Sequence, residues 1–192
     1  MNPISRHAWR PLLLTLGTLL FVFLSACHLS QEGHETEHIQ HGEAVSSTQH
    51  QQASFLVQRT EAEWKTLLPP KTFEVMRHED TERAFSSPLH DKKEEGIYYC
   101  ASCGQALFSS EHKYDSGTGW PSFYQPIAAE RVGTREDHRL FAVRTEVHCS
   151  RCGGHLGHVF EDGPQPTGLR YCMNGAALSF RGRGVAAPPL LD

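Results

Sequence analysis

The spacing of apolar residues changes along the chain, from a helical pattern near residue 60 to a strand pattern after residue 96. Thr60 followed by "EAEWKTLL" predicts a short N-capped helix with acidic residues in its first turn, ended by Pro69 and Pro70. The next stretch, "PKTFEVMRHE", predicts a second short helix.

From Gly96 onwards, short apolar runs alternate with clusters of Gly, Pro, Asp and Asn. The runs are "GIYYC", "QALFSS", "RLFAVRTEVHC", "HVF" and "LRYCM", and the segments between them include "SGTG", "GTRED" and "EDGPQPTG". This alternation predicts a mainly β fold, a compact antiparallel β domain of two small sheets preceded by short helices.

The start of the chain has the layout of a secretory signal. Arg6 and Arg10 precede an uncharged run from Pro11 to Leu24, which is shorter than the roughly 20 residues that a membrane-spanning helix needs. The following "LSAC" resembles the bacterial lipoprotein box, in which cleavage precedes a cysteine that is then lipidated. We therefore expect residues 1–26 to be a lipoprotein signal peptide and Cys27 to carry the lipid. An ordinary signal peptide with a chance cysteine and an uncleaved anchor are the alternatives.

Residues 27–58 are rich in Gln, Ser, Glu and His, which predicts a disordered tether between the lipid and the domain. Because the residue after the lipidated cysteine is His and not Asp, analogy with other lipoproteins favours the outer membrane, facing the periplasm. A polar spacer explains the tether histidines better than loose metal binding does, because their spacing is irregular. These histidines are His28, His34, His38, His41 and His50. A domain over residues 59–184 and a C-terminal tail over 185–192 complete the predicted organisation.

Composition excludes some partners. The 192 residues carry a formal net charge of −4, with 39% apolar and 21% charged residues, as expected of a globular domain with a sizeable core. Lys and Arg are too few and too scattered to form a basic stripe, so we expect no nucleic-acid partner. We expect a monomer.

Four of the six cysteines form two C-x-x-C pairs, each followed by glycine, in "CASCG" and "CSRCGG". This spacing lets two sulfur atoms of each pair reach one ion at about 2.3 Å, so the pairs predict one structural Zn²⁺ with four thiolate ligands and no open position. Two disulfides, or a thioredoxin-like redox pair, are the competing interpretations. A redox pair of that kind should open a helix, and neither pair does. The predicted ligands are Cys100, Cys103, Cys149 and Cys152.

Cys172 is the one cysteine without an assigned partner, in "GLRYCMN". As a strand, this stretch places Arg170, Cys172 and Asn174 on one face and three apolar residues on the other. Arg170 beside the thiol favours the thiolate, which is the nucleophilic form. A buried free cysteine that only packs in the core is the alternative.

"CASCGQALF", "YDSGTGWPSF" and "CSRCGGHLGHVFEDGPQPTGLRYCMN" together resemble the signature of the B-type methionine sulfoxide reductases, which reduce the R epimer of methionine sulfoxide. The similarity runs from roughly Pro70 to Arg181. The resemblance implies that Cys172 is the catalytic nucleophile and that a tryptophan binds the substrate methyl group. The other implied site residues are His155, His158, Asp162, Arg170, Asn174 and Trp120. Since the two histidines are three apart, a straight strand cannot place both on one face.

The resemblance also implies a reaction. Cys172 attacks the sulfoxide sulfur, His158 aided by His155 supplies protons to the departing oxygen, and a sulfenic acid forms on the cysteine. Arg170 and Asn174 support the charge that moves during the attack. The expected role is repair of oxidised envelope proteins under oxidative stress.

One position departs from the family pattern. Many members carry a resolving cysteine two residues before the tryptophan, where this chain has Thr118. We therefore expect a one-cysteine cycle in which thioredoxin, or a thioredoxin-like dithiol, attacks Cys172 directly. Gly175 replaces a frequent serine and is not expected to change the chemistry.

Two other functions compete with the enzyme. A zinc-stabilised β domain can act as a binding module without catalysis, but that function does not explain a nucleophile flanked by Arg170 and Asn174. A metal-capturing lipoprotein would depend on the His-rich tether, and deleting residues 28–58 would then remove its function.

Overall fold

The structure is a computed structural model and describes residues 55–139 and 142–192. The predicted signal peptide, Cys27 and most of the predicted tether, with its five histidines, lie outside the described residues. Within the described part, no helix is long and apolar enough to cross a membrane.

Both predicted helices are present. Helix α1 (Glu61–Leu67) begins at a capping box, in which Thr60 and Glu63 bond each other's backbone N–H groups, and it ends at Leu68 before the proline pair. Helix α2 (Pro70–His78) has proline at its start, where no backbone donor is needed, and ends at Glu79 in the left-handed conformation.

The strands form two antiparallel sheets within the described residues, which confirms the predicted fold class. The smaller sheet has the order β2-β1-β9, from β1 (Gly96–Cys100), β2 (Ala106–Ser109) and β9 (Leu178–Gly182). The larger sheet has the order β3-β4-β8-β7-β6-β5. Its strands are β3 (Lys113–Tyr114), β4 (Ser122–Phe123), β5 (Val132–Asp137), β6 (Arg144–Cys149), β7 (His155–Phe160) and β8 (Arg170–Met173). The 3₁₀ turns are η1 (Ser110–His112), η2 (Ala129–Arg131) and η3 (Gly175–Ala177).

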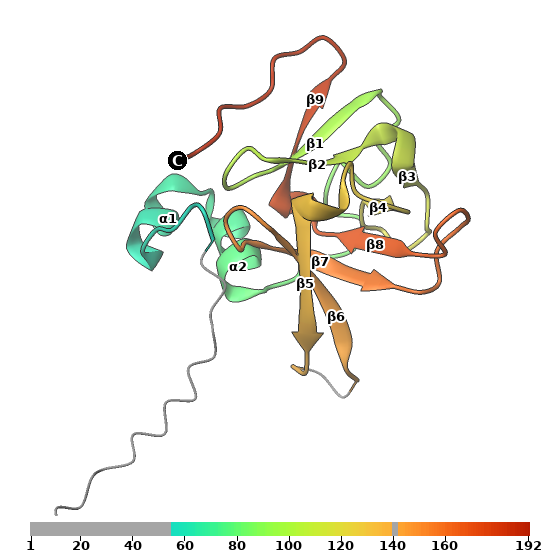
Figure 1. Ribbon diagram of the computed structural model, residues 1–192, viewed down its shortest axis with the longest axis horizontal. Helices are drawn as coiled ribbons and strands as arrows, with labels where there is room; N and C mark the ends of the chain where they lie inside the picture. The colour runs from blue at the N-terminus through green and yellow to red at the C-terminus, as the bar shows by residue number, and fades with distance from the viewer. Residues whose placement is uncertain (1–54, 140–141) are drawn as a thin grey trace, which may run out of the picture. The chain divides into compact units, whose positions relative to one another are not determined.

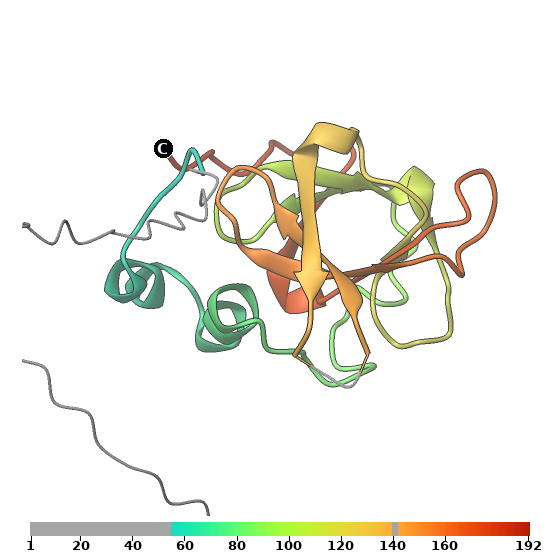
Figure 2. The ribbon, with the colours of Figure 1, turned by 60° about the horizontal axis from the view of Figure 1, so that its bottom comes forward.

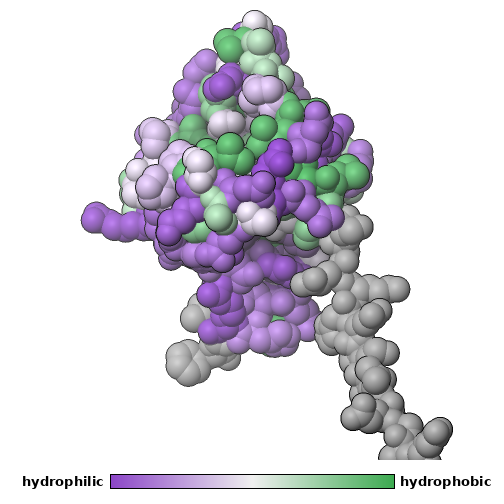
Figure 3. Space-filling model, turned by 90° about the vertical axis from the view of Figure 1, so that its left-hand side faces the viewer, coloured by the Kyte–Doolittle hydropathy of each residue, from purple (hydrophilic) through white to green (hydrophobic). Residues whose placement is uncertain are grey.

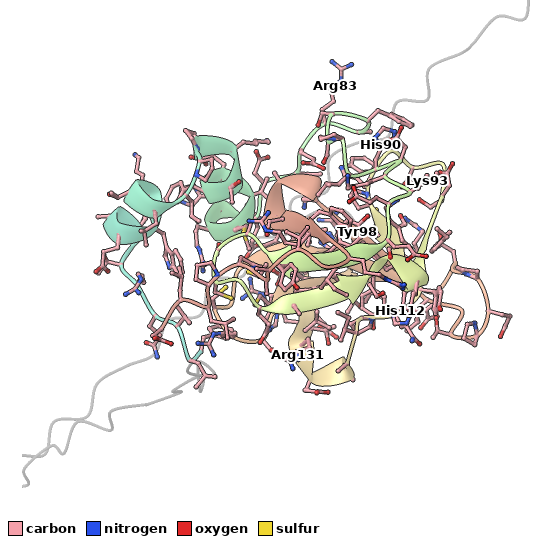
Figure 4. All side chains as sticks on the ribbon, turned by 90° about the horizontal axis from the view of Figure 1, so that it is seen from above. Arg83, His90, Lys93, Tyr98, His112 and Arg131 are labelled. Carbon is pink, nitrogen blue, oxygen red and sulfur yellow. The ribbon has the colours of Figure 1, made fainter. Side chains whose placement is uncertain are left out.

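Both helices lie at one end of the sheets (Figure 1), and the view in Figure 2 shows the same arrangement from below. An aromatic cluster joins the two sheets: the rings of Phe108 and Phe123 stack with centroids 4.4 Å apart, and Tyr98 meets Phe123 edge-on at 5.0 Å. Tyr98 lies in the middle of the side chains of the domain (Figure 4) and is fully buried. The helices add Trp64, Phe73 and other apolar side chains to this core. On the helix-bearing side, exposed apolar residues are interspersed with hydrophilic ones (Figure 3).

Packing of the chain extends beyond both expected domain boundaries. Val57 is buried, and its N–H donates to the Arg151 carbonyl at 3.0 Å, so the packed chain begins before residue 59. At the other end, the Leu191 N–H donates to the Cys103 carbonyl at 3.1 Å, and the Arg151 guanidinium donates to the Leu191 carbonyl at 2.8 Å. The C-terminal segment therefore lies against the cysteine knuckles.

Candidate active site

The four paired cysteines form one buried cluster. Their sulfur atoms all lie within 4.8 Å of one another, and two of the pairs, Cys100 with Cys152 and Cys103 with Cys149, are 3.6 Å apart. Sulfur atoms at about 2.3 Å from a tetrahedral ion are about 3.8 Å apart, whereas a disulfide bond is about 2.05 Å long. None of these four cysteines forms a disulfide, and the distances between their sulfur atoms are those of a metal site.

The surroundings of the cluster also fit a cation held by thiolates. Gly104 and Gly153 follow the two knuckles with φ of +76° and +67°, so the glycines provide the tight turns that the spacing predicts. Arg77 and Gln105 direct N–H groups at the sulfur atoms of Cys152 and Cys149, at 3.6 and 3.4 Å. Burial raises the pKa of Cys100, and a cation bound by the four sulfur atoms would favour their ionised form. Four ligands would leave such an ion no open position, as in a structural site.

Cys172 lies in the middle of the larger sheet, between two strands that contribute to the site. On β8 it pairs with Ser122 of β4 on one side and with His158 of β7 on the other. The backbones approach closely here, because a Cβ atom on Gly157 would overlap the Cys172 carbonyl oxygen. Glycine at this position is therefore a requirement for placing the histidine beside the cysteine.

A β-bulge explains how His155 and His158 converge. The pairing of β6 with β7 runs from Val147 and Gly157 to His148 and His155, so Leu156 is an extra residue on β7. The two imidazole rings consequently lie 5.4 Å apart, centroid to centroid. Gly157 follows Leu156 directly, and a glycine within a strand can mark a bulge, but which residue is inserted depends on the register with β6.

A cavity of about 120 Å³ opens on the thiol. Of the predicted site residues, Cys172, His158, Asn174 and Trp120 line it. Trp120 and Phe160 give the cavity aromatic surface, while Cys172, His158 and Asn174 give it polar groups. The remaining lining residues are Thr81, Arg144 and Gly157.

His158 is held by a carboxylate that sequence reasoning missed. Its Nε2 lies 2.7 Å from Asp137 Oδ2, and the same carboxylate accepts from Arg144 at 2.5 Å and from the Arg139 N–H at 2.9 Å. The Arg139 N–H, with His158 and Arg144, lowers the pKa of Asp137 against the effect of its burial, so Asp137 is an anion at neutral pH. Burial lowers the pKa of His158, and the Asp137 carboxylate opposes that shift.

His155 contacts the cavity only through its neighbour. The ring is 2% exposed, and Nδ1 lies 2.7 Å from Glu146 Oε1, which also binds the Arg135 guanidinium. His155 does not line the cavity, and its Nε2 is buried without a protein partner among the described residues. This geometry makes His155 a support for His158 and not a group that touches substrate.

Arg170 and Asp162 form a pair at the edge of the site. The guanidinium donates to both carboxylate oxygens at 2.8 and 2.9 Å, and it lies 4.4 Å from the centroid of the Phe160 ring. Asp162 is 63% exposed at its side chain and reaches the cysteine only through Arg170. Burial raises the pKa of Cys172, while Thr118 and Arg170 lower it to a smaller extent. The expectation that Arg170 alone favours the thiolate is thus incomplete, because desolvation of the thiol outweighs that charge.

Thr118 lies next to the reactive thiol. Its Oγ1 is 3.8 Å from Cys172 Sγ and 2.9 Å from Ser116 Oγ, which in turn is 2.7 Å from Ser122 Oγ. The other cysteines of the described residues all belong to the metal cluster. A hydroxyl network therefore borders Cys172 where a resolving thiol would stand.

The residues that sequence reasoning missed are buried polar groups on strands and in one loop. Asp137 and Glu146 are 9% and 2% exposed. They stand in "RED" and "RTEV", where an inward-facing carboxylate interrupts the alternation expected of a half-buried strand. Glu82, 5% exposed, lies in the loop between α2 and β1 and had no such signal.

Comparisons with known proteins match most of the described domain. The SelR domain matches residues 68–182. A protein named "Peptide methionine sulfoxide reductase MsrB" from Methanosarcina mazei is 56% identical over 124 residues, which cover 65% of this chain and 89% of the relative. Proteins of the same name from Leptospira interrogans and Thiobacillus denitrificans are similar too. The first is 49% identical over 128 residues, 67% of this chain and 98% of the relative. The second is 54% identical over 122 residues, 64% of this chain and 92% of the relative.

Proposed function

Because the chain belongs to the SelR-domain family of B-type methionine sulfoxide reductases, enzymes that reduce peptide methionine (R)-S-oxide, we propose that it does so through Cys172 in a one-cysteine cycle. The observation that carries the proposal is the pairing of Cys172 with His158 across β8 and β7, at a cavity walled by Trp120. Thiol, proton donor and apolar wall meet at one place.

The first half-reaction follows from the chemistry of the sulfoxide. The Cys172 sulfur attacks the substrate sulfur, the S–O bond breaks, and methionine leaves as the thioether. The oxygen remains on Cys172 as sulfenic acid, so that one thiol and one sulfoxide become one sulfenic acid and one thioether. Trp120, which lines the cavity, offers its face to the S-methyl group.

His158 moves the protons of this step. Asp137 occupies Nε2, which leaves Nδ1 as the nitrogen that exchanges a proton in the cavity. Because burial raises the pKa of Cys172, a nearby base is needed to generate the thiolate. His158 accepts that proton and returns it to the sulfoxide oxygen, and His155, through its ring contact, holds His158 in place. Arg170 supports the charge on sulfur. Asp162 fixes Arg170, and Asn174 fixes the cavity wall.

Regeneration of the thiol consumes an external dithiol. One thiol of the reductant attacks the sulfenic sulfur as its thiolate, and the sulfenic oxygen takes up the thiol proton and leaves as water. The second thiol then resolves the mixed disulfide, which returns the Cys172 thiol and leaves the reductant oxidised. Thr118 in place of a second cysteine supports this route. A thioredoxin or a thioredoxin-like protein has the chemistry required.

The metal site supports the reaction indirectly. Zn²⁺ suits the four cysteines best, because tetrahedral thiolate sites with no open position are characteristic of structural zinc. When bound, such an ion supplies no Lewis acid to the substrate. It ties the knuckle after β1 to the knuckle after β6, and so joins the two sheets.

The N-terminal sequence supports a location of the proposed activity in the cell envelope. A lipid on Cys27 and a tether over residues 27–58 would hold the domain at a membrane surface, with oxidised envelope proteins as its substrates. The outer membrane facing the periplasm is the location that the His at position 28 favours.

The test uses the full chain in detergent, with dithiothreitol as reductant and peptides that carry the R or the S epimer of methionine sulfoxide. We expect reduction of the R epimer only, and loss of that activity in Cys172→Ser with the metal content unchanged. Activity retained in Cys172→Ser would refute the assignment of the nucleophile. A disulfide between Cys172 and another cysteine of the same chain after one turnover would refute the one-cysteine cycle.

A further inference from the structure

We propose that Glu82, which takes no part in the steps above, is a positioning residue that fixes Trp120 and Asn174 relative to each other and thereby sets the specificity of the cavity for the S-methyl group. The inference rests on the proposed function of Cys172 and names a determinant of its substrate range. Trp120 and Asn174 come from segments that are far apart in the sequence, and no hydrogen bond joins their side chains directly within the described part of the chain.

The carboxylate of Glu82 is anchored to the end of the catalytic strand. It is 5% exposed, and its two oxygens accept from the N–H groups of Gly175 at 2.6 Å and Ala176 at 2.8 Å. These N–H groups open the η3 turn that directly follows β8. A buried carboxylate without a cation is costly unless each oxygen is hydrogen-bonded, and no ion pair to Glu82 is present within the described residues. The two bonds meet that requirement.

The peptide groups of the same residue reach both walls of the cavity. The Glu82 N–H donates to Asn174 Oδ1 at 3.0 Å, and the Glu82 carbonyl accepts from Trp120 Nε1 at 3.1 Å. Three residues after Glu82, the Phe85 N–H donates to the Gly119 carbonyl at 2.8 Å, which ties the same loop to the backbone before Trp120. Phe85 holds a left-handed conformation, with φ of +64°, that bulky residues rarely adopt. The loop is thus held firmly against the wall that Trp120 forms.

These bonds decide how the two side chains face the substrate. Asn174 Oδ1 accepts from Glu82, and Nδ2 donates to the Leu156 carbonyl at 3.2 Å, so the amide orientation is fixed by the network and one Nδ2 hydrogen remains for the cavity. The indole N–H bond prevents rotation of the Trp120 ring. Loss of the Glu82 carboxylate releases the loop from the η3 turn, so the side chains of Trp120 and Asn174 both become more mobile.

The consequence is a change in discrimination and not only in rate. A pocket shaped around a methyl group rejects one extra methylene by a factor of about 10 to 200. Methionine and ethionine sulfoxides differ by one methylene on the reacting sulfur, so the ratio of their kcat/KM values reports how tightly Trp120 is held. A purely structural defect that reduces the amount of active enzyme lowers both values equally and leaves the ratio unchanged.

The experiment measures this ratio with R-epimer peptides in the full chain, for wild type, Glu82→Gln and Glu82→Asp. Glu111→Gln, an exposed glutamate, and Arg83→Ala, whose side chain points away from the domain (Figure 4), are matched controls. We expect Glu82→Gln to lower kcat/KM for the methionine peptide by about 10-fold or more and to narrow the ratio by about 5-fold or more. Glu82→Asp should fall between Gln and wild type, and the controls should match wild type.

An unchanged ratio in a folded Glu82→Gln variant would overturn the proposal, whatever happens to the rate. If the variants do not fold, hydrogen exchange in wild type decides. Strong protection of the Trp120 indole N–H and the Gly175 amide supports the proposal, and exchange at the rate of an exposed indole overturns it. A wild type that reduces neither peptide would instead refute the proposed function.

Discussion

Replacing Asp137 with Asn tests whether His158 is the proton donor. The carboxylate accepts three hydrogen bonds, from His158, Arg144 and the Arg139 N–H. An Asn side chain has one oxygen, so its NH₂ group must face one of these donors, and the charge is lost as well. Because the carboxylate opposes the lowering of the His158 pKa by burial, its removal lowers that pKa further.

The magnitude follows from the bond. A hydrogen bond to a charged group contributes about 1.5 to 3 kcal/mol, and about 1.4 kcal/mol corresponds to a factor of ten in an equilibrium constant. A lower His158 pKa makes the ring a weaker base toward the Cys172 thiol, so less of the thiolate that attacks the substrate is formed. We therefore expect kcat/KM for an R-sulfoxide peptide to fall by about 10- to 100-fold near neutral pH.

The assay is the pH dependence of kcat/KM with excess dithiothreitol, for wild type, Asp137→Asn and the exposed control Asp91→Asn. Circular dichroism and metal content verify that the variants are folded. The limb of the profile that reports His158 should move to lower pH in Asp137→Asn alone. A pH profile with the same shape as that of wild type, whatever the absolute value of kcat/KM, would show that His158 is not the proton donor and that another group protonates the oxygen.

Further predictions concern the metal, the strand contact, the vacant resolving position and the first helix. Cys149→Ser should remove the metal and lower the melting temperature sharply, because binding of structural zinc contributes on the order of 10 kcal/mol to folding; metal analysis and calorimetry check this. Gly157→Ala should abolish activity, since the added Cβ overlaps the Cys172 carbonyl oxygen, and a variant with wild-type kcat would contradict that close approach. Thr118→Cys should form a disulfide with Cys172 after one turnover without reductant, seen by mass spectrometry, because the side chains are already 3.8 Å apart. Thr60→Ala should cost about 1 kcal/mol in urea unfolding by removing the capping box, with activity unchanged.

The local parts of this fold could be predicted from sequence because their signals are local. Thr60 and the proline pair mark the ends of α1, and the glycines after the knuckles mark the turns. The strand face that carries Cys172 also follows from the period of two, with Met173 buried on the opposite side. Each of these features depends on residues within a few positions of one another.

The features that could not be predicted from the sequence depend on contacts between residues that are far apart along the chain. The bulge at Leu156 arises from the register between β6 and β7, which the neighbouring Gly157 does not define by itself. Asp137 belongs to the site only because a hairpin brings it back to His158, 21 residues later. Glu82 lies 92 residues before Asn174, and its burial follows from packing of the whole loop. Buried polar residues of this kind need tertiary structure to be recognised.

The metal cluster and the catalytic strand are coupled through chain connectivity. Cys100 ends β1 in the smaller sheet, and Cys149 ends β6 in the larger one, so an ion at the cluster fixes the two sheets relative to each other. After the second knuckle the chain enters β7 at His155, and the Gly154 carbonyl bonds back to the Cys149 N–H at 2.9 Å. The bulge that brings the two histidines together therefore begins two residues from the metal knuckle. We therefore expect a metal bound at the cluster to hold His158 opposite Cys172 without taking part in the chemistry, and loss of metal to reduce activity before the domain unfolds globally.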